Sequence, residues 1–395
     1  MCRATERAAR AKHLTGVPSG VSEQIDVQDH AAPSGQRSGE RIGILTFHRC
    51  INYGSYWQAR SLVEGLRGMG HDAVLLDHRS EQARRAEWRC AFQPLLPDRS
   101  RRDELPQYGA KARKMIRAAD ALPSSAPFPL DRPEEAEDYA AIVVGSDEVW
   151  NMRHPWYGGC GAFYGDGLPA RRLVSYAASF GNHDASEGLH PFWADKLRRF
   201  DAISVRDRNS REMLRAALGM EPELVLDPVL QFPVAREAVE RGADAEAAGE
   251  PYIAVYGHSF PDWYARAVRR AADEAGLKLV SIGYRNDWAD EQRIDAGPDE
   301  FARAIAGAEA LATNFFHGCV FALLFERPFA CVASSYRANK LRDLMEKVGA
   351  EERLVFEDRE SEIAGLLAEP VGSAVGARIA ELRGQSSAYL SRALG

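Results

Sequence analysis

The chain has 395 residues, of which 45% are hydrophobic, and a formal net charge of −7. This length is enough for two ordinary domains with a core each. The negative charge argues against a nucleic-acid-binding protein, because affinity for a phosphate backbone needs a basic surface. A small anionic ligand must therefore be met locally by Arg, Lys, His and backbone groups.

Cysteine spacing and hydropathy argue against further classes of protein. The six cysteines are scattered without a CxxC pair, so neither a zinc cluster nor a disulfide framework is indicated. No stretch approaches the roughly 20 apolar residues of a membrane span, and the start, MCRATERAARAKH, lacks the apolar run of a signal peptide. We expect a cytoplasmic protein without a membrane span, and the sequence does not indicate its oligomeric state.

The first half of the chain begins with a strand, a loop and a helix. Residues 1–40 mix charged and small residues without periodicity, which predicts a disordered extension. A strand is expected over Ile42–Phe47, then a helix with Leu62, Leu66 and Met69 on one face, then a strand over Ala73–His78. This is a βαβ unit, whose crossover should be right-handed.

In the rest of the first domain, which we place at residues 41–235, the strand and helix patterns are less regular. Between residues 80 and 135 the sequence indicates one helix, Lys111–Ala121. Four further strands are expected, at Tyr139–Asp147, Arg172–Phe180, Asp201–Asp207 and Glu223–Leu230. The polar, Ala-rich segment after residue 235 then predicts a domain boundary.

A second domain, residues 236–373, repeats the alternation of strands with helices of 10 to 15 residues. Residues 374–395 read as a final helix that packs back on the first domain. Such alternation is typical of parallel sheets. We therefore predict two Rossmann-like α/β domains that face a cleft, with mainly parallel sheets and helices on both faces. Ligands of tandem α/β domains bind at the carboxyl ends of their strands.

The loop HRCINYGSYWQ follows the first strand and is the first candidate binding segment. Gly54 lets the backbone approach an anion closely, and His48 and Asn52 supply donors. An ordinary βα turn explains the same residues, since the loop is neither GxGxxG nor a P-loop.

The segment VVGSDEVWN ends a buried strand in polar residues. Asp147 can accept a hydrogen bond from a substrate hydroxyl or act as a base. A helix N-cap formed by Ser146 or Asp147 is an equally good explanation.

The third candidate is Arg206, which ends the strand in SVRDRNSREML. Its guanidinium can form two parallel hydrogen bonds with a carboxylate or a phosphate. The alternative is a structural ion pair, either Arg206–Asp207 or Arg208–Asp227.

His317, in TNFFHGCVFALLFERP, lies between a strand end and an apolar helix, with Gly318 leaving room beside it. A single histidine is often structural, but its neutral-range titration makes it the best general-acid candidate in the chain.

Taken in order, several segments resemble the polysaccharide pyruvyl transferase family: IGILTFHRCINYGSYWQARSL, AAIVVGSDEVWN, LVSYAASFG, FDAISVRDRNSREML, LVLDPVL and TNFFHGCVFALLFERPFACV. They span about residues 42 to 350. The resemblance implies a fold similar to two-domain GT-B glycosyltransferases, with phosphoenolpyruvate as a small anionic donor and a sugar or sugar-like acceptor. It further implies a donor-binding Arg, matched by Arg206, and an acidic His in an Arg-Leu-His motif, matched by His317.

This chain has Phe315 where that motif has its Arg, so it is similar to a Ser-Phe-His-Gly branch of the family. Arg337 or Lys340, after the next strand, is expected to supply the missing cation. On this hypothesis Asn52, Gly54, His48 and Gly318 also contact the donor. Asp147 orients or deprotonates an acceptor hydroxyl, while Glu148 and Tyr53 contact the acceptor. One acid and several anion-binding donors suffice, so no metal and no cofactor is expected.

Two other functions remain open on the sequence. A sugar-nucleotide-dependent GT-B glycosyltransferase would use the same cleft and the same cations. A noncatalytic sugar-binding relative would bind ligands without turnover, and Phe315 is its best support.

Overall fold

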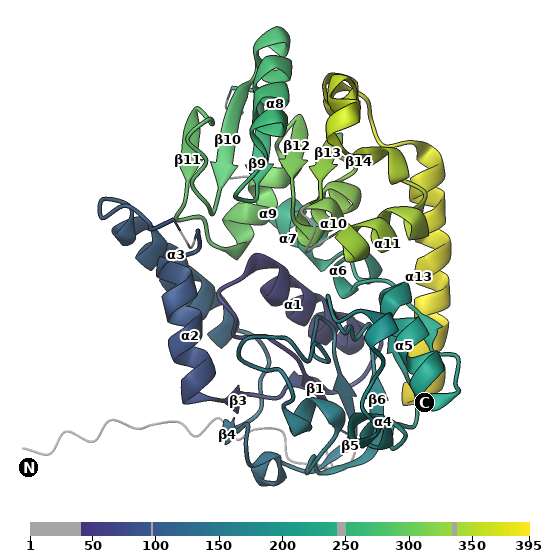
Figure 1. The fold of residues 1–395 in the computed structure, drawn as a ribbon. Helices are drawn as coiled ribbons and strands as arrows, with labels where there is room; N and C mark the ends of the chain where they lie inside the picture. Colours follow the sequence, from purple (N-terminus) through teal and green to yellow (C-terminus); the bar gives the residue numbers. More distant parts are fainter. Residues whose placement is uncertain (1–40, 96–97, 243–249, 334–337) are drawn as a thin grey trace, which may run out of the picture. The chain divides into compact units, whose positions relative to one another are not determined.

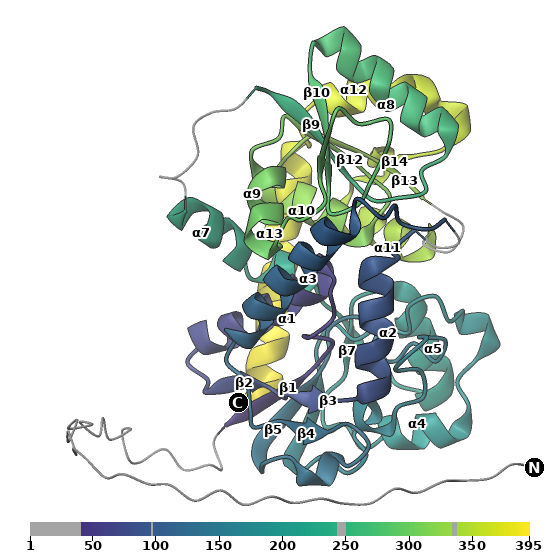
Figure 2. The same cartoon turned by 90° about the vertical axis from the view of Figure 1, so that its left-hand side faces the viewer.

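The computed structural model describes residues 41–95, 98–242, 250–333 and 338–395. The predicted extension over residues 1–40 therefore lies outside the described residues, as does Arg337. Two parallel sheets, one in each half of the chain, form the framework (Figures 1 and 2). Every strand pairing between named strands of the described residues is parallel, which confirms the predicted α/β class.

The first sheet has the order β2-β1-β5-β6, with strands Ala73–Leu75, Ile42–Leu45, Tyr139–Val144 and Ala170–Ser175. Helix α1 (Tyr53–Gly68) connects β1 to β2. Side chains on successive strand positions point to opposite faces. Ile44 and Val143 accordingly pack in a core with α1, whereas Leu45, Ile142 and Val144 belong to a second core.

Shorter elements complete the first half. The two-residue strands pair as β3 with β4 (His78–Arg79, Phe128–Pro129) and β7 with β8 (Ser204–Val205, Glu223–Leu224). The helices are α2 Glu81–Phe92, α3 Leu105–Asp120, α4 Pro191–Leu197, α5 Arg208–Leu218, α6 Pro228–Gln231 and α7 Val234–Arg241. Single 3-10 turns span Pro133–Glu135, Gly161–Tyr164 and Ala185–Glu187.

Two predictions for this half are wrong in detail. Residues 80–135 hold two helices rather than one. Helix α2 was not predicted, because its charged sequence hides the helical spacing. Ser80 caps this helix by accepting from the Ala83 N–H. The strand expected over Glu223–Leu230 ends at Leu224. Pro228 and the Asp227 cap, which accepts from the Val229 N–H at 3.1 Å, start helix α6 instead.

The second sheet has the order β11-β10-β9-β12-β13-β14. In that order, its strands are Glu291–Arg293, Lys278–Ile282, Tyr252–Tyr256, Ala310–Thr313, Phe329–Val332 and Leu354–Val355. The helices of this half are α8 Asp262–Ala275, α9 Pro298–Ala306, α10 Phe316–Phe325, α11 Ala338–Val348 and α12 Ile363–Ala368. The 3-10 segments Glu351–Arg353 and Glu357–Glu362 flank β14.

Both faces of this second sheet are covered by helices. Leu311 and Phe329 pack with α10, while Ala312 and Ala330, at alternate positions, pack with α8 and α12. The polar strand β11 and the two-residue β14 were not predicted, because neither has the length or alternation of a strand signal.

Helices α1 and α13 are among the elements that connect the halves. On α1 the Tyr53 hydroxyl donates to the Ala296 carbonyl at 2.6 Å, and the Trp57 Nε1–H donates to the Pro298 carbonyl at 3.1 Å. Helix α13 (Ser373–Leu394) lies against the first half, where the Tyr389 hydroxyl donates to the Ser175 carbonyl at 2.7 Å (Figure 1). One core consequently contains residues of both sheets.

In the described part of the chain, no single helix is long and apolar enough to cross a membrane. The segments Glu357–Ala368 and Ser373–Leu394 meet the length and composition requirement only as a pair, and that pair is bent by 81°.

Candidate active site

A cavity of about 540 Å³ opens where strands of both sheets end. The loops after β1, β5 and β7 contribute Asn52, Asp147 and Arg206 from the first half. The second half contributes Phe315 and His317, which follow β12. Carboxyl ends of parallel strands are the usual ligand sites of α/β folds, so the cavity is the candidate active site.

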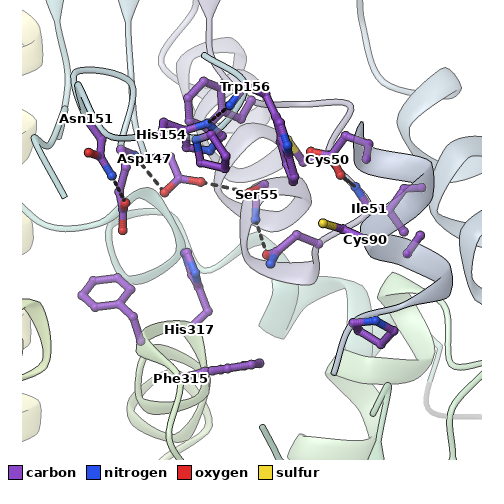
Figure 3. A pocket seen from close by; sticks show the side chains of 18 of the residues that line it. Cys50, Ile51, Ser55, Cys90, Asp147, Asn151, His154, Trp156, Phe315 and His317 are labelled. Carbon is purple, nitrogen blue, oxygen red and sulfur yellow. Dashed lines mark hydrogen bonds between the residues drawn. The ribbon is translucent and has the colours of Figure 1, made fainter. Parts of the chain in front are cut away.

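A buried ionic cluster occupies one side of this cavity. Arg206 donates through Nη2 to Asp147 Oδ1 and through Nη1 to Asp227 Oδ2, both at 3.1 Å. His317 Nε2 lies 3.6 Å from the same Asp227 oxygen. The Ser55 hydroxyl donates to Asp147 Oδ2 at 2.9 Å, and Figure 3 shows this contact above His317. One carboxylate, Asp227, thus lies against both the guanidinium and the imidazole.

These contacts decide the charge states of the cluster. Burial alone would raise the pKa of Asp147, but the charges of Arg206 and His317 and the bond from Ser55 hold that pKa below its usual value. The pKa of Asp227 is lowered in the same way against its burial, by His317 and then by Arg206. Both carboxylates are therefore ionised at neutral pH, and Arg206 is charge-compensated before any ligand binds.

A second ion pair lies beside the first. Lys340 Nζ is 2.5 Å from Glu148 Oε1, and the Asn151 amide donates to Glu148 Oε2 at 2.8 Å. Against the effect of burial, Lys340 lowers the pKa of Glu148. Lys340 does line the cavity, but its charge is matched by a carboxylate.

Asp147 has a backbone conformation that is uncommon for a residue with a side chain. Its φ is +78°, in the left-handed region. Gly145, two residues earlier, has φ +117°, and a Cβ there would lie 2.3 Å from the Tyr176 carbonyl oxygen. This turn is fixed by packing, and it aims the carboxylate at Arg206 and Ser55 rather than capping a helix, which had been the alternative explanation.

Two glycines named in the sequence analysis set the position of His317. A Cβ on Gly54 would lie 2.0 Å from His317 Nδ1, so α1 approaches the imidazole edge closely only because residue 54 is glycine. A Cβ on Gly318 would lie 2.1 Å from Thr313 Oγ1. Gly54 and Gly318 therefore act through close packing.

The structure brings together six of the predicted side chains: Asn52, Asp147, Glu148, Arg206, His317 and Lys340 line one cavity. The Asn52 oxygen caps α1 by accepting from the Ser55 N–H at 3.2 Å. Neither His48 nor Tyr53 reaches the cavity. His48 is buried against Thr46 and Asp77, and Tyr53 stacks on Phe301. For Arg206 the structure shows a pair with Asp227 and Asp147 instead of Asp207.

Sequence reasoning missed the opposite side of the cavity. Four rings meet there, which we call the aromatic wall: Tyr256, His258, Tyr284 and Phe315. The Phe315 ring lies 5.0 to 5.4 Å from the other three, edge to face. Lys111, from α3, also lines the cavity. Phe315 was singled out at the position of the motif arginine, but no motif marked the other three rings or Lys111, because they come from three separate segments.

Comparison with known families assigns the chain to a protein family. The family model for polysaccharide pyruvyl transferase matches residues 52–336, which include every cavity residue described from α1 to α10. The chain belongs to the polysaccharide pyruvyl transferase family. Comparison with curated proteins gives no match.

Among solved structures, this family member is similar to the E. coli heptosyltransferase WaaC with ADP, at 12% identity and a TM-score of 0.38, covering 74% of this chain and 87% of that one. It is also similar to UDP-GlcNAc 2-epimerase from Neisseria meningitidis bound to UDP-GlcNAc, at 10% identity and a TM-score of 0.44, covering 89% and 99%.

Proposed function

We propose that this protein transfers a pyruvyl group from phosphoenolpyruvate to hydroxyls of a sugar or sugar-like acceptor. One observation supports the proposal above all: His317, the proposed acid, lies beside ionised Asp147 and Asp227 in a cavity lined by both halves. Membership of the family supports a transferase. The donor and the acceptor are the parts that we propose.

The reaction balances with groups that line the cavity. His317 gives a proton to C3 of the donor, which becomes the methyl group of the product. Two acceptor hydroxyl oxygens bond to C2, and the C2–O bond to phosphate breaks. Asp147 takes the proton of one attacking hydroxyl, and the proton of the other leaves with phosphate. The net product is a pyruvate ketal plus inorganic phosphate.

The carboxylates have a second effect in this scheme. Asp227 Oδ2 lies 3.6 Å from His317 Nε2, so it places a negative charge beside the imidazole before the donor binds. The Arg206 guanidinium offsets part of the repulsion between the two aspartates and the anionic donor, since it is bonded to both.

A sugar-nucleotide glycosyltransferase is the second candidate, and the aromatic wall favours it, because a nucleobase can stack on such rings. The two candidates differ in which donor binds the folded protein. Only a bound ligand raises the melting temperature by mass action. We expect phosphoenolpyruvate, and not UDP- or ADP-sugars, to raise it.

Turnover tests the proposal directly. The protein is incubated with phosphoenolpyruvate and a panel of pyranose acceptors with free hydroxyl pairs, and the products are followed by mass spectrometry and phosphate release. We expect an added pyruvyl unit with one phosphate released for each transfer. Sugar transfer from a nucleotide donor, or binding of phosphoenolpyruvate without any product across the panel, would contradict it.

A further inference from the structure

Lys111 is a buried cation in the cavity whose charge no carboxylate balances. The residue is 4% exposed, and its Nζ donates to the Gly283 carbonyl at 2.9 Å. The ammonium also lies over the rings of Tyr53 and Tyr284, 4.6 and 4.3 Å from their centroids. No salt bridge joins Lys111 to an acidic group within the described ranges.

The other lysine and the arginine of the cavity differ from Lys111 in this respect. Arg206 is bonded to Asp147 and Asp227, and Lys340 to Glu148. A buried ammonium without a counter-ion is costly, and it becomes favourable when an anion enters. Among the cavity residues that the structure describes, Lys111 is therefore the cation with unused capacity for an anion.

We propose that Lys111, beside the aromatic wall, forms an oxyanion subsite that holds the phosphate of the donor. The subsite lies on the side of the cavity where Phe315 replaces the arginine of the family motif. The identity of the donor rests on the proposed function, whereas the oxyanion site itself does not.

The protonation of Lys111 gives this subsite a measurable signature. Burial lowers the pKa of the Lys111 ammonium to about 7, so at pH 8 most of the empty protein carries a neutral amine there. A bound dianion favours the charged form, and binding must then take up a proton from solution.

Other titratable groups near Lys111 have to be separated from it in this measurement. Elements around α3 carry two tyrosines, one buried glutamate and three carboxylates with cationic partners: Tyr53, Tyr284, Glu87, Glu104, Asp295 and Glu300. Arg285 pairs with Glu104, and Lys114 with Asp295 and Glu300. His258 and His317 face the same cavity, so the informative quantity is the difference between wild type and a Lys111 variant.

The test is calorimetric titration at pH 8 with sulfate, a dianion that binds no proton near neutral pH, in two buffers of different ionisation enthalpy. Wild type should take up about one proton from solution for each sulfate bound. Lys111→Met should bind sulfate about 10- to 100-fold more weakly and lose that uptake. Lys111→Arg should retain binding without the uptake, since arginine stays charged.

Lys114→Met is the matched control, because Lys114 lies one turn away on α3 and already has carboxylate partners. It should leave sulfate binding and proton uptake as in wild type. Lys111→Met removes a buried charge, so it is expected to fold, and circular dichroism verifies this. Equal affinity and equal uptake in wild type and Lys111→Met, or no sulfate binding by wild type, would overturn the subsite.

The same variants separate this inference from the proposed function. Titration with phosphoenolpyruvate should show the Lys111-dependent proton uptake seen with sulfate. If the sulfate result holds but no acceptor is pyruvylated, the subsite stands and the proposed function fails. If pyruvyl transfer occurs and Lys111→Met leaves the KM for phosphoenolpyruvate unchanged, the subsite fails alone.

Discussion

His317 is held by Gly54 on one edge and Asp227 on the other, which leaves its imidazole 12% exposed at the cavity. Because it is the proposed acid and makes few structural contacts, His317→Ala should lower kcat by about 10² to 10⁴ with little change in unfolding free energy. Steady-state kinetics and a urea titration measure both quantities. His71→Ala, outside the cavity, is the control, and normal turnover by the His317 variant would remove the acid role.

Arg206 carries a structural role in addition to any contact with the donor. Arg206→Ala leaves Asp147 and Asp227 buried without their guanidinium partner, which should cost about 3 to 5 kcal/mol of unfolding free energy. Arg208→Ala breaks a surface pair with Glu346 and should cost less than about 1 kcal/mol. Urea unfolding compares the two, and equal stabilities would show that the aspartates do not depend on Arg206.

His78 predicts a pH dependence of stability. It is buried, its Nε2 lies 2.9 Å from the Thr46 carbonyl oxygen, and burial, with the charge of nearby His48, lowers its pKa to about 3. The folded protein thus holds His78 neutral while the unfolded chain takes up a proton below about pH 6.5. This stabilisation is present above pH 6.5 and is lost as the pH falls toward 3.

Between pH 7 and pH 5 the loss from His78 should amount to about 2 kcal/mol. His78→Gln, which keeps a donor but does not titrate, should show a correspondingly flatter profile of urea midpoints over that range. Identical slopes for the variant and wild type would mean that other groups cause the acid sensitivity.

At the scale of elements, α1 matters because its first turn lies against His317. Gly54→Ala would place a methyl group on the imidazole, so kcat should fall by about tenfold or more, since a displacement of about 1 Å can cost 10²-fold. Gly68→Ala, at the other end of α1, meets nothing within 4 Å and should leave kcat unchanged. Kinetics of both variants decide the matter: equal kcat values would show that α1 does not position His317.

The elements that could be predicted were those with clear patterns. The strands β1, β5, β9 and β12 are apolar runs. Asn52 and Asp147 lie in the loops after β1 and β5, and His317 lies in the first turn of α10, which follows β12. Helix α2 and strand β11 could not be predicted, because their polar residues give no periodic apolar face. The expected strand around Asp227 failed because a proline and a capping aspartate outweighed an apolar run.

At the scale of the whole molecule, the fold follows from alternation of strands and helices, but the cavity depends on how two sheets meet. Arg206 and His317 were expected in one cleft, and the structure places both beside Asp227. The shared carboxylate itself was not foreseen. Lys111 could not be predicted either, because a lysine on a polar helix normally faces solvent, and here tertiary packing with Tyr53 and Tyr284 buries it.

Pyruvyl transfer with protonation at C3 is the central claim, and a reaction in deuterated water tests it most directly. The product that forms from phosphoenolpyruvate and an acceptor of the pyranose panel is examined by mass spectrometry and NMR. We predict a pyruvate ketal whose methyl group carries one deuterium for each transfer, formed far more slowly by His317→Ala. A product without deuterium in a methyl group, an enolpyruvyl ether, or an acceptor that has gained a sugar instead would contradict the mechanism.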